Sequence, residues 1–357
     1  MDIETKLGLV KQVGEEVITE EELKHLLQTK EHPIAYDGFE PSGTDIHIAQ
    51  GILRSININK MASAGIRFNM LVADWHAWAN NKMGGDLERI QTVGKYLIEV
   101  WKHCGMDLKN VEFIWANDFV KEPEYWKKVM QVARNSTINR IIRTGQIMGR
   151  KEGEMQQASQ ILYPCMQCAD IFQLKADICQ LGQDQRKVNV LARELGPSLG
   201  FWKPVVVSHH MLIGLGEPPK TKDIDRVIDL KMSKSKPDTA IFMNDSEEEI
   251  KRKIAKAYCP AKVTEENPLL EYSKYIIFEK FNTMEIKRQE KFGGDLVIEN
   301  YIELEKLYSE GKIHPMDLKN AVAHYINEAV KPVREAFHKD SKLKHLLETI
   351  RKFEVTR

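Results

Sequence analysis

The sequence predicts an α/β fold in which a mostly parallel sheet is followed by a separate helical domain. Five short apolar runs rich in β-branched residues stand at 33–39, 66–74, 111–115, 176–182 and 204–209, which is the pattern of buried strands. Between the second and third runs, apolar residues recur at helical spacing from Ile90 to Cys104, and alternation of strand and helix is typical of a parallel sheet. The predicted fold class is therefore a Rossmann-like α/β domain followed by an all-helical C-terminal domain.

Three segments make up the predicted organisation. Residues 1–30 form a helical extension, since 19–29 has the composition of a capped surface helix. Residues 31–240 form the sheet domain and end in a lysine-rich loop. Residues 241–357 form the helical domain, because no strand pattern follows about residue 240 and Ser246 can cap the first of its helices. Ligands of such a sheet bind beyond the carboxyl ends of its strands.

The composition indicates a folded protein without a dominant charge. The chain has 357 residues, 42% of them hydrophobic, which is enough to build one large or two ordinary cores. Its 52 basic and 52 acidic residues cancel, so support for an anionic partner has to be local. The five cysteines, an odd number, and the lack of a signal peptide or membrane-spanning segment favour a reducing, cytoplasmic location with no membrane partner.

The segment KMSKSKP, residues 231–237, concentrates three lysines and two serines. A solvated surface loop is the ordinary interpretation of such a run. Its position after the last predicted strand favours another interpretation, because it places the lysines near the ligand-binding edge of the sheet. Flexible lysines supply point charges that suit the oxygens of a triphosphate.

A second segment, GFEPSGTDIHIAQG at 38–51, runs from a predicted strand through a Pro-Ser-Gly turn into a helix. Free backbone N–H groups at the start of a helix attract anions, so we expect a phosphate there. His47 can donate to a phosphate oxygen, and Ala49 is small enough for a flat base to approach the backbone. A capping or core role for His47 is an open alternative.

Together the two segments resemble the signature sequences of class I aminoacyl-tRNA synthetases. KMSKS, residues 231–235, matches the second signature completely. HIAQ, residues 47–50, has Ala49 where the family usually has Gly and Gln50 where it usually has His. Further motifs are similar to the tyrosyl-tRNA synthetases of archaea and eukaryotes, in order over about residues 33–330: AYDGFEPSG, LVADWHAW, ILYPCMQCADIF, DQRKVNVLAREL, KFGGDL and HPMDLKNAV.

A stripe of polar residues precedes the fourth predicted strand. Tyr163, Gln167 and Asp170 are spaced to lie on one face of a helix, which Pro164 could begin. The two cysteines of CMQC fall on the other face, so core packing is favoured over metal binding, and we expect no protein metal site. From the residues alone, the stripe could equally be a solvated face.

The resemblance implies that this stripe belongs to a tyrosine pocket. Asp170 and Tyr36 would bind the phenolic hydroxyl, and a buried pair that bonds a hydroxyl rejects phenylalanine without an editing site; tyrosyl-tRNA synthetases are themselves the standard example of this rule. Three further residues would bind the α-amino end: Tyr163, Gln167 and Gln185. Ala73 and His76 would form the side wall, with a structural role for His76 as the alternative.

The resemblance also implies ATP as the co-substrate, with Mg²⁺ carried in by the nucleotide. Residues of the two signatures and of the loops after the fourth and fifth strands would bind ATP: Pro41, Ser42, Gly43, His47, Ala49, Gly182, Asp184, Met211, Leu212, Lys231, Met232, Ser233, Lys234 and Ser235. The substrate carboxylate is already an anion, so catalysis should be electrostatic. Four residues would stabilise the departing pyrophosphate: His47, Gln50, Lys231 and Lys234.

Two local features favour an RNA partner. Residues 131–151 hold several arginines and no acid, and basic residues exceed acidic ones from Lys312 onward. Charge alone fits an ordinary solvated face equally well. By resemblance to the family, Arg140 and Arg143 would approach the acceptor stem of tRNA(Tyr), and Phe292 and Asp317 would bind the anticodon.

The predicted function is the activation of L-tyrosine and its transfer to tRNA(Tyr) by a cytoplasmic enzyme, which the resemblance suggests is a homodimer. A tryptophanyl-tRNA synthetase is the near alternative, although Tyr36 and Asp170 suit a phenol better than an indole. A non-catalytic RNA-binding relative is disfavoured by the intact lysine segment. A nucleotidyltransferase acting on small molecules would leave the helical domain unexplained.

Overall fold

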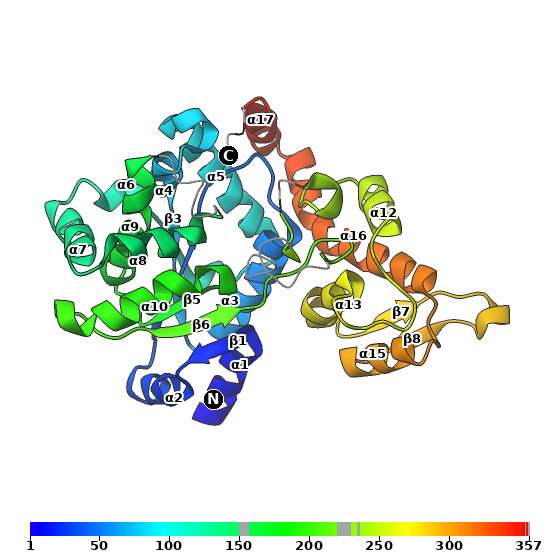
Figure 1. The fold of residues 1–357 in the computed structure, drawn as a ribbon. Helices are drawn as coiled ribbons and strands as arrows, with labels where there is room; N and C mark the ends of the chain where they lie inside the picture. Colours follow the sequence, from blue (N-terminus) through cyan, green and yellow to red (C-terminus); the bar gives the residue numbers. More distant parts are fainter. Residues whose placement is uncertain (150–156, 220–229, 234–235, 354, 356–357) are drawn as a thin grey trace.

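A six-stranded sheet carries the larger, N-terminal part of the chain (Figure 1). The computed structural model describes residues 1–149, 157–219, 230–233, 236–353 and 355. The strands of the sheet are β1 (Gly14–Ile18), β2 (Ile34–Phe39), β3 (Arg67–Val72), β4 (Val111–Trp115), β5 (Ile178–Gly182) and β6 (Val205–His209). Their spatial order is β1-β6-β5-β2-β3-β4, with all neighbours parallel except β1, which pairs antiparallel with β6. The carboxyl ends of β2 to β6 therefore meet at one edge.

All five predicted strands form, with ends shifted by at most two residues. The edge strand β1 is an addition, because the sequence predicted only helix within residues 1–30. That extension contains α1 (Ile3–Val13), β1 and α2 (Glu20–Thr29). The sequence of β1, GEEVI, is short and carries two acids, so its strand state depends on the ladder that β6 offers.

Helices cover both faces of the sheet, as the alternation of side chains along the strands requires. On β3, Phe68, Met70 and Val72 pack into one core, whereas Leu71 packs into the other. The first core is shared with α1, α2, α3 (Arg54–Ser63) and α5 (Leu87–His103), whose predicted apolar stripe is buried. The second is shared with α6 (Ala116–Phe119), α7 (Pro123–Arg134), α8 (Ile138–Thr144), α9 (Ala158–Gln173) and α10 (Arg186–Leu195). The short helix α4 (Asp74–Ala79) follows β3.

The helix that bears the polar stripe begins earlier than predicted. It starts at Ala158, where the Gln157 and Gln160 side chains form a reciprocal cap, and Pro164 lies inside it. A proline inside a helix removes one backbone donor. The helix continues because nearly every residue from Tyr163 to Phe172 is buried against its neighbours, so tertiary burial outweighs the local preference.

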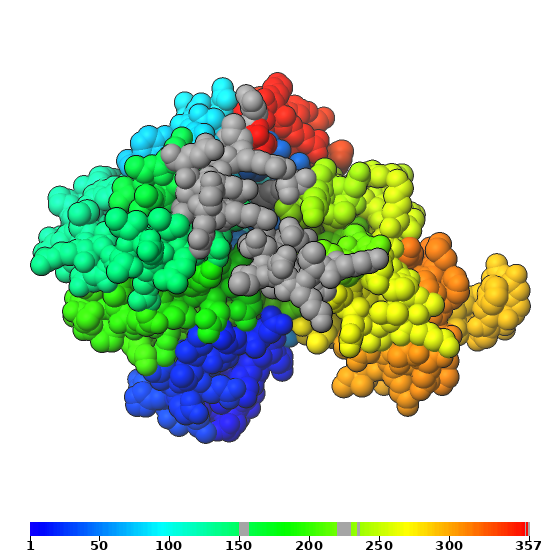
Figure 2. Space-filling view, viewed as in Figure 1, coloured from blue at the N-terminus to red at the C-terminus, as the bar shows by residue number. Residues whose placement is uncertain are grey.

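The C-terminal part is mostly helical and lies beside the sheet domain (Figure 1). Its helices are α12 (Glu247–Ala255), α13 (Pro268–Tyr272), α14 (Phe278–Phe281), α15 (Tyr301–Ser309), α16 (Pro315–Lys339) and α17 (Ser341–Ile350). Ser246 caps α12 as predicted, accepting from the backbone of Glu249. The all-helical prediction missed a hairpin of β7 (Met284–Ile286) and β8 (Leu296–Ile298), whose three-residue strands are too short to give a sequence pattern. The segment between them projects from the edge of the molecule (Figures 1 and 2).

The two parts are joined by backbone pairing as well as by a shared core. Ile48 N donates 2.9 Å to Ile241 O, and Met243 N donates 2.9 Å to Ile46 O. The chain after the lysine segment is thereby paired with the chain just before α3. At the far end, α17 returns to lie against α5 (Figure 1). Within the described residues, no helix combines the length and apolar character needed to cross a bilayer.

Candidate active site

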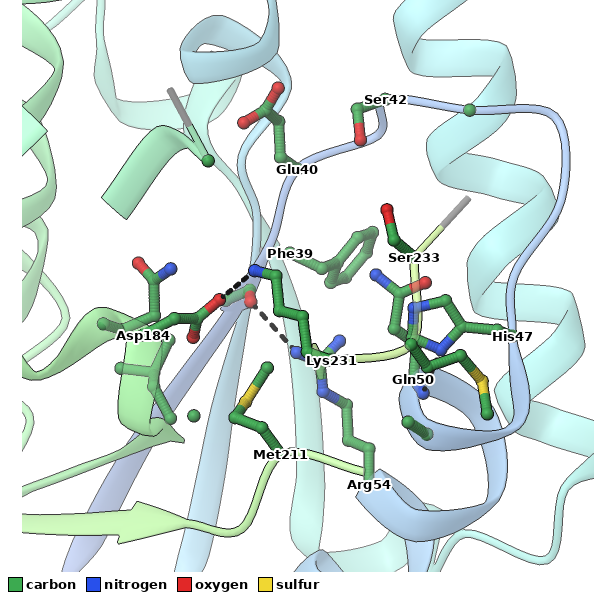
Figure 3. A pocket seen from close by; sticks show the side chains of 18 of the residues that line it. Phe39, Glu40, Ser42, His47, Gln50, Arg54, Asp184, Met211, Lys231 and Ser233 are labelled. Carbon is green, nitrogen blue, oxygen red and sulfur yellow. Dashed lines mark hydrogen bonds and ion pairs between the residues drawn. The ribbon is translucent and has the colours of Figure 1, made fainter. Parts of the chain in front are cut away.

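A cavity of about 1050 Å³ opens at the carboxyl ends of β2, β3, β5 and β6. The turn after β2, the start of α3, one face of α9 and residues 231–233 complete its wall. Figure 3 shows Glu40, Arg54 and Lys231 from three of these segments. Most residues that the sequence singled out for tyrosine and ATP line it: Tyr36, Ser42, Gly43, His47, Ala49, Gln50, Ala73, His76, Tyr163, Gln167, Asp170, Gly182, Asp184, Gln185, Met211, Leu212, Lys231, Met232 and Ser233. Pro41 is buried but is not part of the wall. Lys234 and Ser235 lie outside the described residues.

Asp170 is a fully buried carboxylate on the wall formed by α9. The Tyr125 hydroxyl donates a 2.9 Å hydrogen bond to its Oδ1, and His76 Nε2 lies 2.8 Å from its Oδ2. Burial lowers the pKa of His76, but the Asp170 carboxylate outweighs it and the net shift is upward. Each carboxylate oxygen has a second lone pair, so Asp170 can still accept from a hydroxyl that enters the cavity.

Tyr36 approaches the same region from β2 and is also buried. Burial, followed by the nearby Asp170 charge, raises the pKa of Tyr36 well above its ordinary value. Its hydroxyl is therefore neutral and can donate. An acceptor on α9 and a donor on β2 together match a phenol, which donates one hydrogen bond and accepts another.

A carboxylate and three polar side chains form a second group in the cavity. The Tyr163 hydroxyl donates to Glu40 Oε2 at 3.1 Å, and Gln167 Nε2 donates to Gln185 Oε1 at 3.1 Å. Gln185 in turn donates 3.0 Å to the carbonyl of Ile147. Acceptors predominate in this group, so its chemistry suits an ammonium ion. Glu40 was not predicted as a site residue, although its place directly after a predicted strand was an available signal.

The start of the first long helix of the sheet domain is not the open N-terminus that the sequence predicted. A π-helical turn, Ala49–Leu53, precedes α3, and both Gln50 N and Gly51 N donate to His47 O. Ile48 N donates to Ile241 O, in the chain after the lysine segment. These backbone donors are thus already used. An anion here would be bound mainly by side chains such as those of His47 and Gln50, which face the cavity (Figure 3).

Lys231 crosses the cavity mouth and lies close to Asp184 (Figure 3). The distance from Lys231 Nζ to Asp184 Oδ2 is 2.8 Å. Below them, Gly182 leaves room for Met211, because a Cβ at Gly182 would stand only 2.3 Å from Met211 Sδ. Lys231 thus offers a cation to phosphates, and Asp184 offers an acceptor to ribose hydroxyls. Met211 offers an apolar surface to a flat base.

The chain is similar to known aminoacyl-tRNA synthetases. A family model described as tRNA synthetases class I (W and Y) matches residues 28–331. A cytoplasmic tyrosine–tRNA ligase of Arabidopsis thaliana is 50% identical to the chain, over 100% of this chain and 90% of its own length. The chain belongs to this synthetase family, in its tyrosine branch.

Solved structures of tyrosyl-tRNA synthetases share the fold of the chain. The crystal structure of the Pyrococcus horikoshii tyrosyl-tRNA synthetase complexed with L-tyrosine is 39% identical and has a TM-score of 0.91, covering 98% of this chain and 100% of that one. A Plasmodium falciparum tryptophanyl-tRNA synthetase is 16% identical with a TM-score of 0.68, covering 98% and 92%, which shows a shared fold alone.

Two further residues of the synthetase site were missed by sequence analysis. Tyr125, on α7, reaches Asp170 from a helix that carried no functional motif. Arg54 lines the cavity from the start of α3, with Nε 2.8 Å from Asp37 Oδ2. Burial raises the pKa of Asp37 to about 6, against the opposing effect of Arg54. Only the folded chain brings these residues together, so no local pattern could have revealed them.

His209, the last residue of β6, and His210 both line the cavity but have different partners. His209 is beside Gln180 Nε2, 2.7 Å away, and burial followed by the Arg54 charge lowers its pKa to about 4. His210 lies between Glu15 and Glu271. Cys165 and Cys168 of α9 are buried, and burial raises the pKa of both thiols, as in ordinary core packing.

None of the four residues expected to contact RNA lines the cavity, and they occupy two parts of the chain, α8 and the C-terminal part. Arg140 is on α8 and pairs with Glu194, while Arg143 donates to the carbonyl of Asn139. Phe292 is 61% exposed in the projecting segment between β7 and β8. Asp317 is half-buried in the first turn of α16. Arg150 and Lys151, also in the basic segment, lie outside the described residues.

Proposed function

We propose that this synthetase activates L-tyrosine with ATP and transfers the tyrosyl group to tRNA(Tyr). The single observation that carries the substrate assignment is Asp170, a fully buried carboxylate in the cavity wall, with the buried Tyr36 hydroxyl near it. A buried acceptor is stable only if a donor meets it. Tyrosine supplies a hydroxyl donor, whereas phenylalanine has none and tryptophan offers only an indole N–H at another position.

Two polar groups of the cavity orient the amino acid, one binding its phenol and the other its α-ammonium. Its phenol donates to Asp170 and accepts from Tyr36. Its α-ammonium faces Glu40, with Tyr163, Gln167 and Gln185 around it. Phenylalanine leaves the first pair desolvated and unpaired, which is a penalty of roughly 10⁴-fold or more in kcat/KM in sites of this kind.

The first chemical step is an in-line displacement at the α-phosphorus of ATP. A carboxylate oxygen of tyrosine forms the new P–O bond, and the bond to the β-phosphate oxygen breaks, so pyrophosphate leaves with that electron pair. No general base is needed, since the attacking carboxylate is already ionised. His47, Gln50 and Lys231, together with Lys234, stabilise the charge that accumulates on the leaving group.

Asp184 and the loop after β6 hold the nucleoside part of ATP. Asp184 accepts from ribose hydroxyls once Lys231 turns to the phosphates, and Met211 supplies apolar surface for the base. Across the described residues, no three His, Cys, Asp or Glu side chains are grouped so that they could bind a metal ion. Mg²⁺ would be carried in by ATP and would neutralise phosphate charge.

The second step passes the tyrosyl group from phosphate to a hydroxyl of the terminal ribose of tRNA, and AMP leaves. Arg140 and Arg143 approach the acceptor stem, and Phe292 and Asp317 contact the anticodon. The exposed ring of Phe292 supports this role, because unpaired bases stack on aromatic side chains. We assign the enzyme to the cytoplasm, as a homodimer.

Amino-acid-dependent exchange of labelled pyrophosphate into ATP tests the proposal. Tyrosine should support exchange, while tryptophan and phenylalanine at the same concentration should give at most background. Charging of a tRNA(Tyr) transcript should follow. Exchange with tryptophan at a comparable kcat/KM would refute the substrate assignment, and no exchange with any amino acid would refute the activity.

A further inference from the structure

Two neighbouring residues of α13, in the C-terminal part of the chain, bind both backbone polar groups of Ile213, in the loop after β6. Glu271 Oε2 accepts a 3.2 Å hydrogen bond from Ile213 N, and the Tyr272 hydroxyl donates 2.9 Å to Ile213 O. Tyr272 is fully buried. Both polar groups of Ile213 are therefore fixed by side chains that come from outside the sheet domain.

The same carboxylate also fixes His210, which lines the cavity. His210 Nε2 lies 3.1 Å from Glu271 Oε2, His210 Nδ1 lies 3.3 Å from Glu15 Oε1 of β1, and the ring stacks on Tyr275 at 4.4 Å. A neutral imidazole would present a lone pair to one of the two carboxylates. The geometry thus requires an imidazolium that donates from both nitrogens.

Ile213 is paired directly with the segment that carries the signature lysine. It forms an antiparallel bridge with Lys231, flanked by bonds of 2.8 Å from Gly214 N to Leu230 O and from Met232 N to Leu212 O. Lys231 then extends to Asp184 in the cavity. A continuous chain of contacts runs from α13 through Ile213 to the base of the Lys231 side chain.

We propose that Glu271 and Tyr272 of α13 are positioning residues for adenylate formation, which they support by fixing the backbone pairing that carries Lys231. This inference rests on the proposed function, since it assigns the two residues to the ATP side of that site. A lysine that neutralises a leaving group must be placed within a fraction of an ångström. One bond on each side of Lys231, at Leu230 and Met232, ties this segment to the loop after β6, and α13 supports that loop through Ile213.

Glu271→Gln, Tyr272→Phe and the double variant test the proposal in the full-length protein by pyrophosphate exchange. In the double variant we expect kcat to fall and KM for ATP to rise, with kcat/KM for ATP lower by about tenfold, the effect of losing roughly one charged hydrogen bond. KM for tyrosine should stay within about twofold, because α13 does not touch the tyrosine subsite.

Two matched variants of the same domain serve as controls. Glu279→Gln removes a carboxylate that pairs with Lys60 of α3 at 2.7 Å, and Tyr308→Phe removes a hydroxyl that donates 2.9 Å to Pro260 O. Neither residue lines the cavity. Their exchange kinetics should match wild type, and thermal melting should show that all variants fold.

The proposal is overturned if the double variant keeps wild-type kcat and KM for ATP, or if tyrosine and ATP kinetics worsen by the same factor. Should the double variant not fold, the Tyr272→Phe variant alone decides, since it removes one oxygen atom only. Wild-type protein without exchange activity would instead refute the proposed function, and that result is distinguishable because it needs no variant.

Discussion

Asp170 shows how a single buried charge can select a substrate. A carboxylate withdrawn from water is costly unless donors meet its oxygens. The Tyr125 hydroxyl donates to Asp170 Oδ1, and His76 Nε2 lies 2.8 Å from Oδ2, so both side chains hold the carboxylate from the protein side. On the proposed assignment, the phenol binds at the remaining acceptor positions of Asp170, and Tyr125 and His76 take part in the selection by holding the carboxylate.

Removal of the Tyr125 hydroxyl should therefore weaken tyrosine recognition without affecting ATP. In Tyr125→Phe we expect KM for tyrosine to rise by about tenfold, as for a lost hydrogen bond to a charged group, and the preference for tyrosine over phenylalanine to narrow. Steady-state pyrophosphate exchange measures both. Tyr96→Phe is the matched control, because the Tyr96 hydroxyl is also buried but pairs with Asn244 outside the cavity. An equal rise of KM in both variants would argue against a specific role.

Lys231 should matter for the chemical step and little for tyrosine binding. Lys231→Ala removes positive charge where pyrophosphate departs, so we expect the rate of adenylate formation to fall by about 10²-fold. Single-turnover measurement of tyrosyl-adenylate, beside tyrosine affinity from equilibrium titration, separates the two effects. Lys203→Ala removes an exposed lysine paired with Glu22 and should leave both unchanged. Equal losses of rate and affinity in Lys231→Ala would contradict the assigned role.

At the scale of secondary structure, the elements that could be predicted are those specified by residues next to one another in the sequence. The five central strands are continuous apolar runs, and Ser246 is a local cap, so each could be recognised from neighbouring residues. The edge strand β1 and the hairpin of β7 and β8 form because a partner strand is present. The start of α9 was misplaced because Pro164 suggests a first turn, whereas the helix begins at Ala158, after the reciprocal cap of Gln157 and Gln160.

The cap at Ser246 allows a measurement of how much one local contact stabilises the protein. Its side chain accepts a 3.2 Å hydrogen bond from Glu249 N, and Ser246→Ala should lower the free energy of unfolding by about 1 kcal/mol. Urea denaturation followed by circular dichroism gives this value. Ser309→Ala is the comparison. Ser309 is the last residue of α15 and donates to the carbonyl of Lys306, so its substitution should lower the free energy of unfolding by less. If Ser309→Ala lowered the free energy of unfolding as much as Ser246→Ala, the stabilisation could not be assigned to the helix cap.

At the scale of the whole molecule, His210 connects the N-terminal strand, the nucleotide loop and the helical domain. Burial lowers the pKa of His210, but Glu15 and Glu271 outweigh it and raise the pKa to about 9. Lys274, Tyr275 and His209 are the other polar neighbours. The stability that this pairing contributes is therefore complete below the unfolded pKa of about 6.5 and is lost as the pH rises through 9.

The expected result is a pH-dependent loss of stability that depends on this one residue. Between pH 6.5 and 9.5 the urea midpoint of the wild type should fall by more than that of His210→Gln, which cannot titrate. Groups elsewhere contribute equally to both proteins and cancel in the comparison. Parallel curves for the two proteins over this range would show that His210 is not charged in the folded state.

The site as a whole could be predicted only in part. The signature residues stand in two segments, so a resemblance was enough to bring His47 and Lys231 to one cavity. Arg54 and Tyr125 were not found, because each acts through a contact that only the folded chain forms, whereas Glu40 was overlooked although it directly follows a predicted strand. Backbone donors at the helix start were expected to be free, and the pairing of Ile48 with Ile241 could not be inferred from either segment alone.

The most direct measurement is a crystal structure of the protein with tyrosine and a non-hydrolysable ATP analogue. We expect the phenolic oxygen within hydrogen-bond distance of Asp170 and Tyr36, and the triphosphate between His47 and Lys231, with Lys231 released from Asp184. A tyrosine bound in the reverse orientation, or a nucleotide bound away from both signature segments, would contradict the mechanism.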